Sequence, residues 1–363
     1  MATKDTKVRP VRVGVVGVGG AGEVHVKAYK ALPGVEIVAV SDASGPRVDL
    51  IKTTYNIANG HTDWNELVER DDIDVISIAT PNYLHMPVAV AALNAGKHVL
   101  SEKPLARSSA EGQAMVDAAE ANDRVLGVSF NHRYRGDVSI LKQVIDAGTL
   151  GSVYYAKAYW MRRQGVPFWG GWFSKHELAG GGPMIDLGVH MLDMTLYLLG
   201  EPEPTSVSAA VYSELAPRGR GSLHPLQGEF DVEDLSTAFV RLAGGGTLLL
   251  EASWAGYGHQ MDDFGVELFG TDAGAQLDNR EWKNTDTLRI FTDIAGVPTI
   301  STPRVDRMGE NEGHVGAIRD FLDVVLGDPA EWKHHRGRAG LKRARIIEAA
   351  YQSAKENREI VLK

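Results

Sequence analysis

The chain has 363 residues, carries a formal net charge of −9 at pH 7 and contains no cysteine. Because a single hydrophobic core rarely serves more than about 250–300 residues, this length predicts two domains. The acidic balance argues against nucleic acid and anionic membrane surfaces as main partners. The absence of cysteine excludes disulfides, thiolate nucleophiles and cysteine-ligated metal ions.

The opening residues 1–10 are polar and lack the apolar core of a signal peptide. No apolar run approaches the ~18 residues that a membrane helix needs. We therefore expect a cytoplasmic protein with no membrane partner.

The first third of the chain alternates short apolar runs with amphipathic stretches. Such alternation predicts a parallel sheet with helices on both faces, the α/β pattern of the Rossmann fold. We expect strands over 11–16, 35–40, 74–79, 98–100 and 125–129, and helices over 21–32, 84–95 and 108–122.

The rhythm changes after Phe130, where strand-like runs follow one another with few helices between them. This pattern predicts an α+β domain with a mostly antiparallel sheet. Residues 216–228 are polar and rich in Pro and Gly, so we expect a loop there. The expected strands are 153–161, 205–212, 235–242, 246–254, 264–270 and 287–291, and the expected helices are 138–147, 183–199, 312–326 and 338–355.

Residues 17–22 read Gly-Val-Gly-Gly-Ala-Gly, a G-x-G-x-x-G motif between the first expected strand and the first expected helix. Its glycines permit a tight turn and let the backbone approach a pyrophosphate at the helix N-terminus. Asp42 ends the next expected strand, where a carboxylate binds the ribose hydroxyls and repels a 2′-phosphate. NAD is therefore favoured over NADP. A structural turn and, for Asp42, a helix N-cap are the alternatives.

Ligands of an open parallel sheet lie at the carboxyl ends of its strands, so the segments after each strand are further candidates. Lys103 follows one such strand, where its ammonium can stabilise negative charge on a substrate oxygen. A solvated surface lysine is the alternative. The expected cofactor-binding residues are Gly17, Gly19, Gly20, Ala21, Gly22, Asp42, Thr80, Pro81, Asn82, His85, Glu102 and Lys103.

The expected helix at 183–199 carries Asp186, His190 and Asp193 at spacings i, i+4 and i+7, which predicts one polar face on an otherwise apolar helix. A histidine beside a carboxylate is typical of an acid/base catalyst. The alternatives are a buried ion pair and a stripe that faces solvent.

On these motifs the chain resembles the Gfo/Idh/MocA oxidoreductases. The resemblance is carried by the glycine loop at 17–22, Asp42, Glu102-Lys103-Pro104 and the sequence Gly-Gly-Gly-Pro-Met-Ile-Asp-Leu-Gly-Val-His-Met-Leu-Asp at 180–193. It implies that Lys103, Asp186 and His190 form the catalytic group. It also implies an open second sheet whose free face contacts another copy in a homodimer or homotetramer. Relatives of this kind often have a cis peptide bond before the proline that matches Pro104.

The resemblance implies an NAD(H)-dependent dehydrogenase that oxidises a secondary hydroxyl of a sugar, cyclitol or glycoside. His190 would move the hydroxyl proton, and Lys103 would stabilise the oxygen. We expect a NAD-binding domain at 1–129 and a substrate-binding and oligomerisation domain at 130–363. The alternatives are a glycoside hydrolase that uses bound NAD for transient oxidation, a non-catalytic NAD-binding sensor and a carbonyl reductase working in the reverse direction.

Residues 160–176 concentrate aromatic and basic side chains, including Phe168 and Trp169. Aromatic faces stack on the C–H faces of pyranose rings, although core packing or an oligomer interface would use the same residue types. No metal site is expected, because His176-Glu177 begins HExxH but position 180 is glycine. The expected substrate-binding residues are Lys103, Arg133, Trp160, Arg163, Trp172, Asp186 and His190, with a structural role as the alternative for Arg133.

Overall fold

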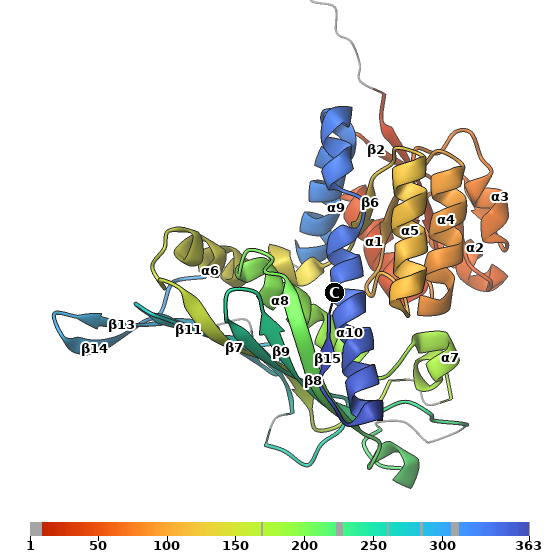
Figure 1. The fold of residues 1–363 in the computed structure, drawn as a ribbon. Helices are drawn as coiled ribbons and strands as arrows, with labels where there is room; N and C mark the ends of the chain where they lie inside the picture. Colours follow the sequence, from red (N-terminus) through yellow and green to blue (C-terminus); the bar gives the residue numbers. More distant parts are fainter. Residues whose placement is uncertain are drawn as a thin grey trace, which may run out of the picture. The chain divides into compact units, whose positions relative to one another are not determined.

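The computed structural model describes residues 9–167, 170–222, 228–259, 261–283, 286–305 and 312–362. Backbone contacts divide the chain into two compact units, each considered by itself (Figure 1). The first contains the chain up to Leu105 together with Ala110–Ser129 and His314–Arg338, and the second contains the remainder. The functional boundary expected between residues 129 and 130 stays a prediction.

The first unit is built on a six-stranded parallel sheet, which confirms the predicted Rossmann fold. The sheet order is β3-β2-β1-β4-β5-β6. The apolar runs that predicted β4 and β5 are buried along their whole length, as expected for strands covered on both faces. The strands are β1 (Val11–Val16), β2 (Val35–Ser41), β3 (Asn59–His61), β4 (Val75–Ile78), β5 (His98–Ser101) and β6 (Leu126–Val128).

Three helices of the first unit share one apolar cluster with the sheet, and they come from distant parts of the chain. Val26, Ile51 and Phe321 belong to this cluster and lie on α1 (Gly20–Lys30), α2 (Gly45–Tyr55) and α9 (Glu312–Leu326). In Figure 1, α4 (His85–Asn94) and α5 (Ser109–Ala121) lie side by side. The short helix α3 (Trp64–Val68) packs against α4. The helices α2 and α3 and the strand β3 were not predicted, and α2 buries only Val48 and Ile51.

The second unit is built on a nine-stranded sheet with the order β14-β13-β12-β11-β7-β10-β9-β8-β15. Only the β7–β10 pair is parallel, so the predicted mostly antiparallel sheet is confirmed. Its strands are β7 (Val153–Arg162), β8 (Pro204–Tyr212), β9 (Leu235–Leu242), β10 (Thr247–Ser253), β11 (Asp262–Gly270), β12 (Gly274–Arg280), β13 (Leu288–Ile294), β14 (Val297–Ser301) and β15 (Ile360–Val361). The helices are α6 (Gly136–Asp146), α7 (His176–Ala179), α8 (Val189–Leu198) and α10 (Arg338–Glu356).

The strands β12, β14 and β15 were not expected from the sequence. β12 reads GAQLDNR and β14 reads VPTIS, so both contain residues that are poor strand formers. Pairing with neighbouring strands outweighs this local preference. Residues 216–228, expected as a loop, include a short 3₁₀ turn at Ala216–Arg218, while 223–227 lie outside the described residues.

Strand β7 shows how the second sheet separates its two faces. Ala156, Ala158 and Trp160 are buried, and the ring of Trp160 contacts His190 of α8. The alternating residues Lys157 and Tyr159 are partly exposed. One face of the sheet therefore packs on α8, and the opposite face carries polar and aromatic side chains.

The expected helix at 183–199 consists of two parts. A π-helical turn (Met184–Gly188) comes first, and α8 follows it directly. A π turn closes i→i+5 hydrogen bonds, so side chains four residues apart across it no longer align as in an α-helix. This turn separates Asp186 from the regular spacing of His190 and Asp193.

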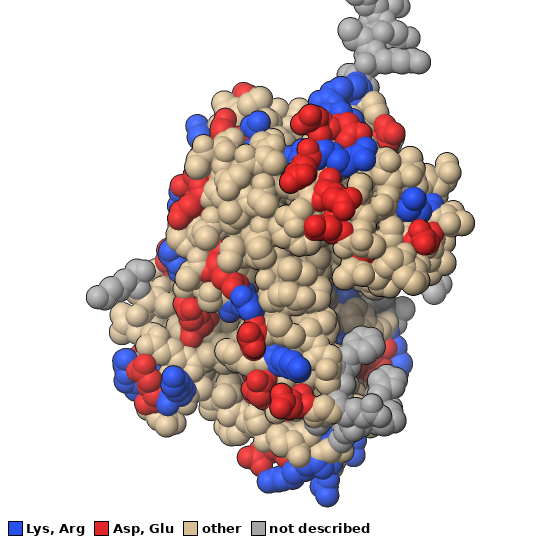
Figure 2. Space-filling view, turned by 90° about the vertical axis from the view of Figure 1, so that its right-hand side faces the viewer, with Lys and Arg blue, Asp and Glu red and all other residues tan. Residues whose placement is uncertain are grey.

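Acidic and basic side chains are interspersed, rather than gathered by sign, on the face drawn in Figure 2. Among the described residues, no helix has both the length and the apolar character needed to cross a membrane.

Candidate active site

The glycine loop between β1 and α1 has the geometry that a pyrophosphate site requires. Gly17 has φ +81°, and a Cβ on Gly22 would lie 1.9 Å from the carbonyl oxygen of Gly17. These two positions therefore need glycine. Around Gly19 and Gly20, by contrast, an added Cβ would meet no described atom within 4 Å. The loop thus presents open backbone at the N-terminus of α1, where a phosphate can approach.

Asp42, which directly follows β2, is hydrogen-bonded to this loop. Its Oδ2 accepts a hydrogen bond from the backbone N–H of Val18 at 2.9 Å, and its Oδ1 accepts one from Ser44 at 2.9 Å. Arg47 donates to the Val18 carbonyl and to Glu23, each at 2.6 Å. The guanidinium nearest to Asp42 in sequence is therefore engaged within the loop.

Several hydroxyl groups are buried at the carboxyl ends of the parallel strands. Ser41, Thr80 and Ser129, which end or follow β2, β4 and β6, have buried hydroxyl oxygens with no partner among the described residues. Buried polar groups in proteins are nearly always paired. Together with the open glycine loop, these hydroxyls fit a polar dinucleotide at this edge of the sheet.

The side chain of His85 contacts the backbone of two loops. The ring nitrogens of His85 lie 2.8 Å from the Pro104 carbonyl oxygen and 3.0 Å from that of Thr80. Burial lowers the pKa of this histidine. His85 therefore joins two loops of the first unit. Asn82 is buried in a short 3₁₀ turn (Asn82–Leu84) just after Pro81.

Glu102 is a buried carboxylate that holds the backbone of Lys103. Its Oε1 lies 2.8 Å from Nε2 of His25, and its Oε2 accepts from the Lys103 backbone N–H at 3.2 Å. Burial raises the pKa of Glu102, but the hydrogen bond with His25 and nearby positive charge lower it to about 2. The Lys103–Pro104 peptide bond is cis. Glu102 is thus ionised and fixes the start of the segment that presents Lys103.

Two histidines beside Glu102 were missed by sequence reasoning. His25 of α1 is fully buried and contacts Ser77 through Nδ1 at 2.8 Å. His314 of α9 lies 3.7 Å from Glu102, although it is 212 positions further along the chain. A lone histidine in a helix carries no pattern that would have revealed either contact.

In the second unit, Asp186 and His190 each contact buried aromatic side chains. The indole N–H of the fully buried Trp254 donates to Asp186 Oδ2 at 2.9 Å. The ring of His190 lies 4.7 Å from that of His132 and 5.6 Å from that of Trp160, measured between centroids. Sequence reasoning identified Trp160 but missed Trp254 and His132, because both depend on packing against α8 and the π turn.

Asp193 forms a buried ion pair. Its carboxylate accepts from Arg343 Nε at 2.9 Å, with both side chains 1% exposed. It also accepts two hydrogen bonds from Arg133, whose Nε lies 2.8 Å from Oδ2. These contacts favour the buried ion-pair interpretation of Asp193 and a structural role for Arg133.

The remaining expected substrate residues, Trp172 and Arg163, lie in the segment between β7 and α7. Trp172 stacks on Phe173 with ring centroids 3.8 Å apart, and Arg163 donates to the carbonyl of Gly258. Phe168 and Trp169 lie outside the described residues. Within the part of the chain that the structure describes, no group of three or more His, Asp or Glu side chains could hold a metal ion.

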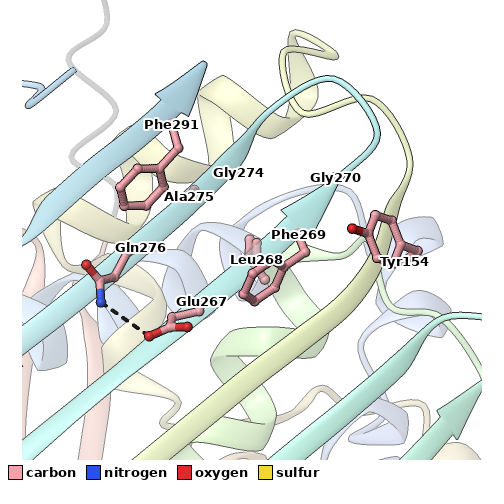
Figure 3. A pocket seen from close by; sticks show the side chains of 9 residues that line it. All are labelled: Tyr154, Glu267, Leu268, Phe269, Gly270, Gly274, Ala275, Gln276 and Phe291. Carbon is pink, nitrogen blue, oxygen red and sulfur yellow. Dashed lines mark hydrogen bonds between the residues drawn. The ribbon is translucent and has the colours of Figure 1, made fainter. Parts of the chain in front are cut away.

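A groove of about 450 Å³ lies on the second sheet and is separate from these side chains (Figure 3). Phe269 of β11, Phe291 of β13 and Tyr154 line it, and Gln276 donates to Glu267 at 3.3 Å along one side. The residues Tyr154 and Phe291 are 56% and 37% exposed. This groove is an apolar surface feature of the sheet.

The Rossmann sheet, the open glycine loop and Asp42 define a dinucleotide-binding protein. Comparison with known families is more specific. Residues 11–130 match the model of an oxidoreductase family with an NAD-binding Rossmann fold, and residues 138–276 match the Gfo/Idh/MocA C-terminal domain. The chain belongs to the Gfo/Idh/MocA family of oxidoreductases.

The relatives include several sugar and cyclitol dehydrogenases. D-glucoside 3-dehydrogenase of Escherichia coli is 31% identical over 97% of this chain and 98% of its own length. Levoglucosan dehydrogenase of Pseudarthrobacter phenanthrenivorans is 29% identical over 88% of this chain and 84% of its own length. A solved structure of levoglucosan dehydrogenase in complex with NADH and levoglucosan superimposes with a TM-score of 0.84 at 26% identity, covering 97% of this chain and 99% of that one.

Proposed function

We propose that this protein is an NAD-dependent dehydrogenase that oxidises a secondary hydroxyl of a sugar, cyclitol or glycoside. The observation that carries this proposal is the match over nearly the whole length of both chains to D-glucoside 3-dehydrogenase. The buried hydroxyls at the strand ends and the open glycine loop support NAD as the cofactor.

In the proposed reaction, His190 removes the hydroxyl proton of the substrate as general base. The ammonium of Lys103 stabilises the oxygen as negative charge grows on it. Asp186, held by the Trp254 indole, orients His190 or raises its basicity. Bound NAD would supply the hydride acceptor for the same carbon.

The proposal is tested by incubating the purified chain with excess NAD and a panel of hexoses, pentoses, inositols, anhydrosugars and glycosides. Steady growth of absorbance at 340 nm with at least one substrate supports a dehydrogenase. Substrate cleavage without steady NADH release would instead indicate a glycoside hydrolase that retains NAD. Binding of NAD without turnover of any compound, in either direction, would indicate a sensor.

Replacing Asp42 with alanine is expected to change cofactor choice. A charge-assisted hydrogen bond is worth roughly 1.5–3 kcal/mol, so NAD should bind about 10–100-fold more weakly. NADP should gain relative to NAD, because the carboxylate that repels its 2′-phosphate is removed. The measurement is the dissociation constant of each reduced cofactor, with the exposed Asp49→Ala of α2 as control.

Asp42 also braces Val18, so the ratio of the two constants is the informative quantity. Equal weakening of NADH and NADPH binding would leave Asp42 a purely structural role and contradict the prediction.

We also propose that a second copy of the chain packs on the face of the second sheet that carries the groove at Phe269 and Phe291, giving a homodimer or homotetramer. The exposed aromatic side chains there support this choice of surface. Phe291→Glu is expected to shift the protein to the monomer in size-exclusion chromatography with light scattering, because the interface would bury an unpaired charge. An unchanged mass would contradict the proposal that this face forms the interface.

A further inference from the structure

Trp282 is a half-exposed tryptophan in the turn that follows β12. Its side chain is 46% exposed, yet its indole N–H donates to Asp262 Oδ2 at 2.9 Å. Its ring lies 5.0 Å from that of Phe264 and 5.6 Å from that of Trp160, between centroids. Since the ring of Trp160 in turn contacts His190, a series of ring contacts within the second unit links His190 to the half-exposed Trp282.

The backbone that presents Trp282 is strained. Glu281 and Trp282 have φ of +50° and +61°, the left-handed region that side chains with a Cβ disfavour. The Lys283 N–H donates a hydrogen bond to the Arg280 carbonyl at 2.9 Å and closes the turn. The Glu281 N–H donates to the Asp262 carbonyl of β11 at 3.1 Å. Trp282 has a disfavoured backbone conformation and is only half buried, so it adds little to the stability of the core. Strain of this kind is concentrated at ligand sites.

Asp262 gives the surface a polar centre. Its Oδ1 accepts from the indole N–H of Trp160 at 2.8 Å and from Nε of Arg162 at 2.9 Å. Burial raises the pKa of Asp262, but these hydrogen bonds and the charge of Arg162 lower it overall, so the carboxylate is ionised at neutral pH. The side chains of Asp262 and Arg162 keep 30% and 21% exposure, respectively. A carboxylate and a guanidinium are therefore reachable beside the half-exposed ring of Trp282.

This combination matches the chemistry of a cyclic polyol. A sugar or cyclitol ring has C–H faces that pack on aromatic rings, and hydroxyls that both donate to a carboxylate and accept from a guanidinium. The planes of Trp160 and Trp282 are inclined by 65°, an edge-to-face contact rather than a parallel stack. A purely apolar ligand would gain nothing from the ion pair, and an ionic ligand would meet both signs of charge.

We propose that Trp282, together with the Arg162–Asp262 pair, is the subsite that recognises the substrate ring beside His190. This inference rests on the proposed dehydrogenase function and adds the residues that select a cyclic substrate. Trp282 supplies the stacking face, Asp262 holds it in place, and Arg162 with Asp262 binds ring hydroxyls.

The test uses Trp282→Gly, which removes the ring and also relieves the left-handed backbone. With levoglucosan, methyl β-D-glucopyranoside and myo-inositol as substrates, we expect KM to rise about tenfold while kcat changes little, because stacking contributes equally to the ground and transition states. Trp282→Phe keeps a ring and is expected to recover most of the lost affinity. Lys283→Ala, a neighbouring exposed side chain of the same turn, is the matched control.

The outcomes separate this inference from the proposed function. A wild-type protein that turns over no compound of the panel refutes the function, whereas wild-type turnover with unchanged KM in Trp282→Gly refutes only the subsite. An equal rise of KM in Lys283→Ala, or a changed oligomeric mass in Trp282→Gly without a change of KM, would also overturn it. Asp262→Asn, which preserves side-chain size, is expected to raise KM severalfold and provides the same test if Trp282→Gly does not fold.

Discussion

Replacing His190 with alanine is expected to lower kcat by about 10²–10⁴-fold, the usual contribution of a positioned acid/base group. The protein should remain folded, because the ring of His190 contacts His132 and Trp160, while the buried ion pair of α8 is formed by Asp193 with Arg343. The measurements are steady-state NADH formation and a thermal melt of each protein.

Two further variants make this result specific. His190→Asn preserves polarity and much of the packing, so it should lose activity to the same extent if proton transfer is the cause. His334→Ala removes an exposed histidine of the same chain and should have normal turnover. A folded His190→Ala protein with wild-type kcat would remove this residue from the reaction.

Replacing Lys103 with methionine is expected to lower both kcat and kcat/KM by about 10²–10³-fold, as for the loss of one group that stabilises an oxyanion. Methionine preserves the length of the side chain and removes its charge. The backbone contact with Glu102 should survive, because it uses the Lys103 N–H rather than the ammonium. The exposed Lys30→Met of α1 is the matched control.

An effect on KM alone would give Lys103 a binding role rather than a catalytic one. Cofactor affinity should be measured as well, because Lys103 is also a candidate for NAD binding. Wild-type kinetics in Lys103→Met would leave this lysine a solvated surface group.

Most strands of the first unit follow closely from the sequence, and the reason is local. An apolar run such as Val75–Ile78 is stable only when both of its faces are covered. Its burial in a parallel sheet can therefore be predicted from the run itself. The glycine loop is similarly local, since Gly17 and Gly22 satisfy steric demands that arise within one strand–turn–helix segment. The fold class of both units and the position of the cofactor loop were predictable for this reason.

The contacts of the charged and aromatic groups depended on residues far apart in the chain. Asp193 shares an apparent polar face with Asp186 and His190, yet its partner Arg343 lies 150 residues away and turns it into a buried ion pair. The π turn before α8 also breaks the helical spacing on which that face was predicted. Weakly patterned strands such as Gly274–Arg280 form because neighbouring strands pair with them.

The sequence by itself therefore determined the Rossmann sheet, the antiparallel second sheet and the residue types for dinucleotide binding, because periodicity and turn sterics act between near neighbours. Only the tertiary structure decided which carboxylate is structural, which indole holds Asp186 and which aromatic ring remains exposed near Trp160. Those choices depend on the hydrogen-bond partners and burial that each side chain finds once distant segments pack together, and no local pattern encodes them.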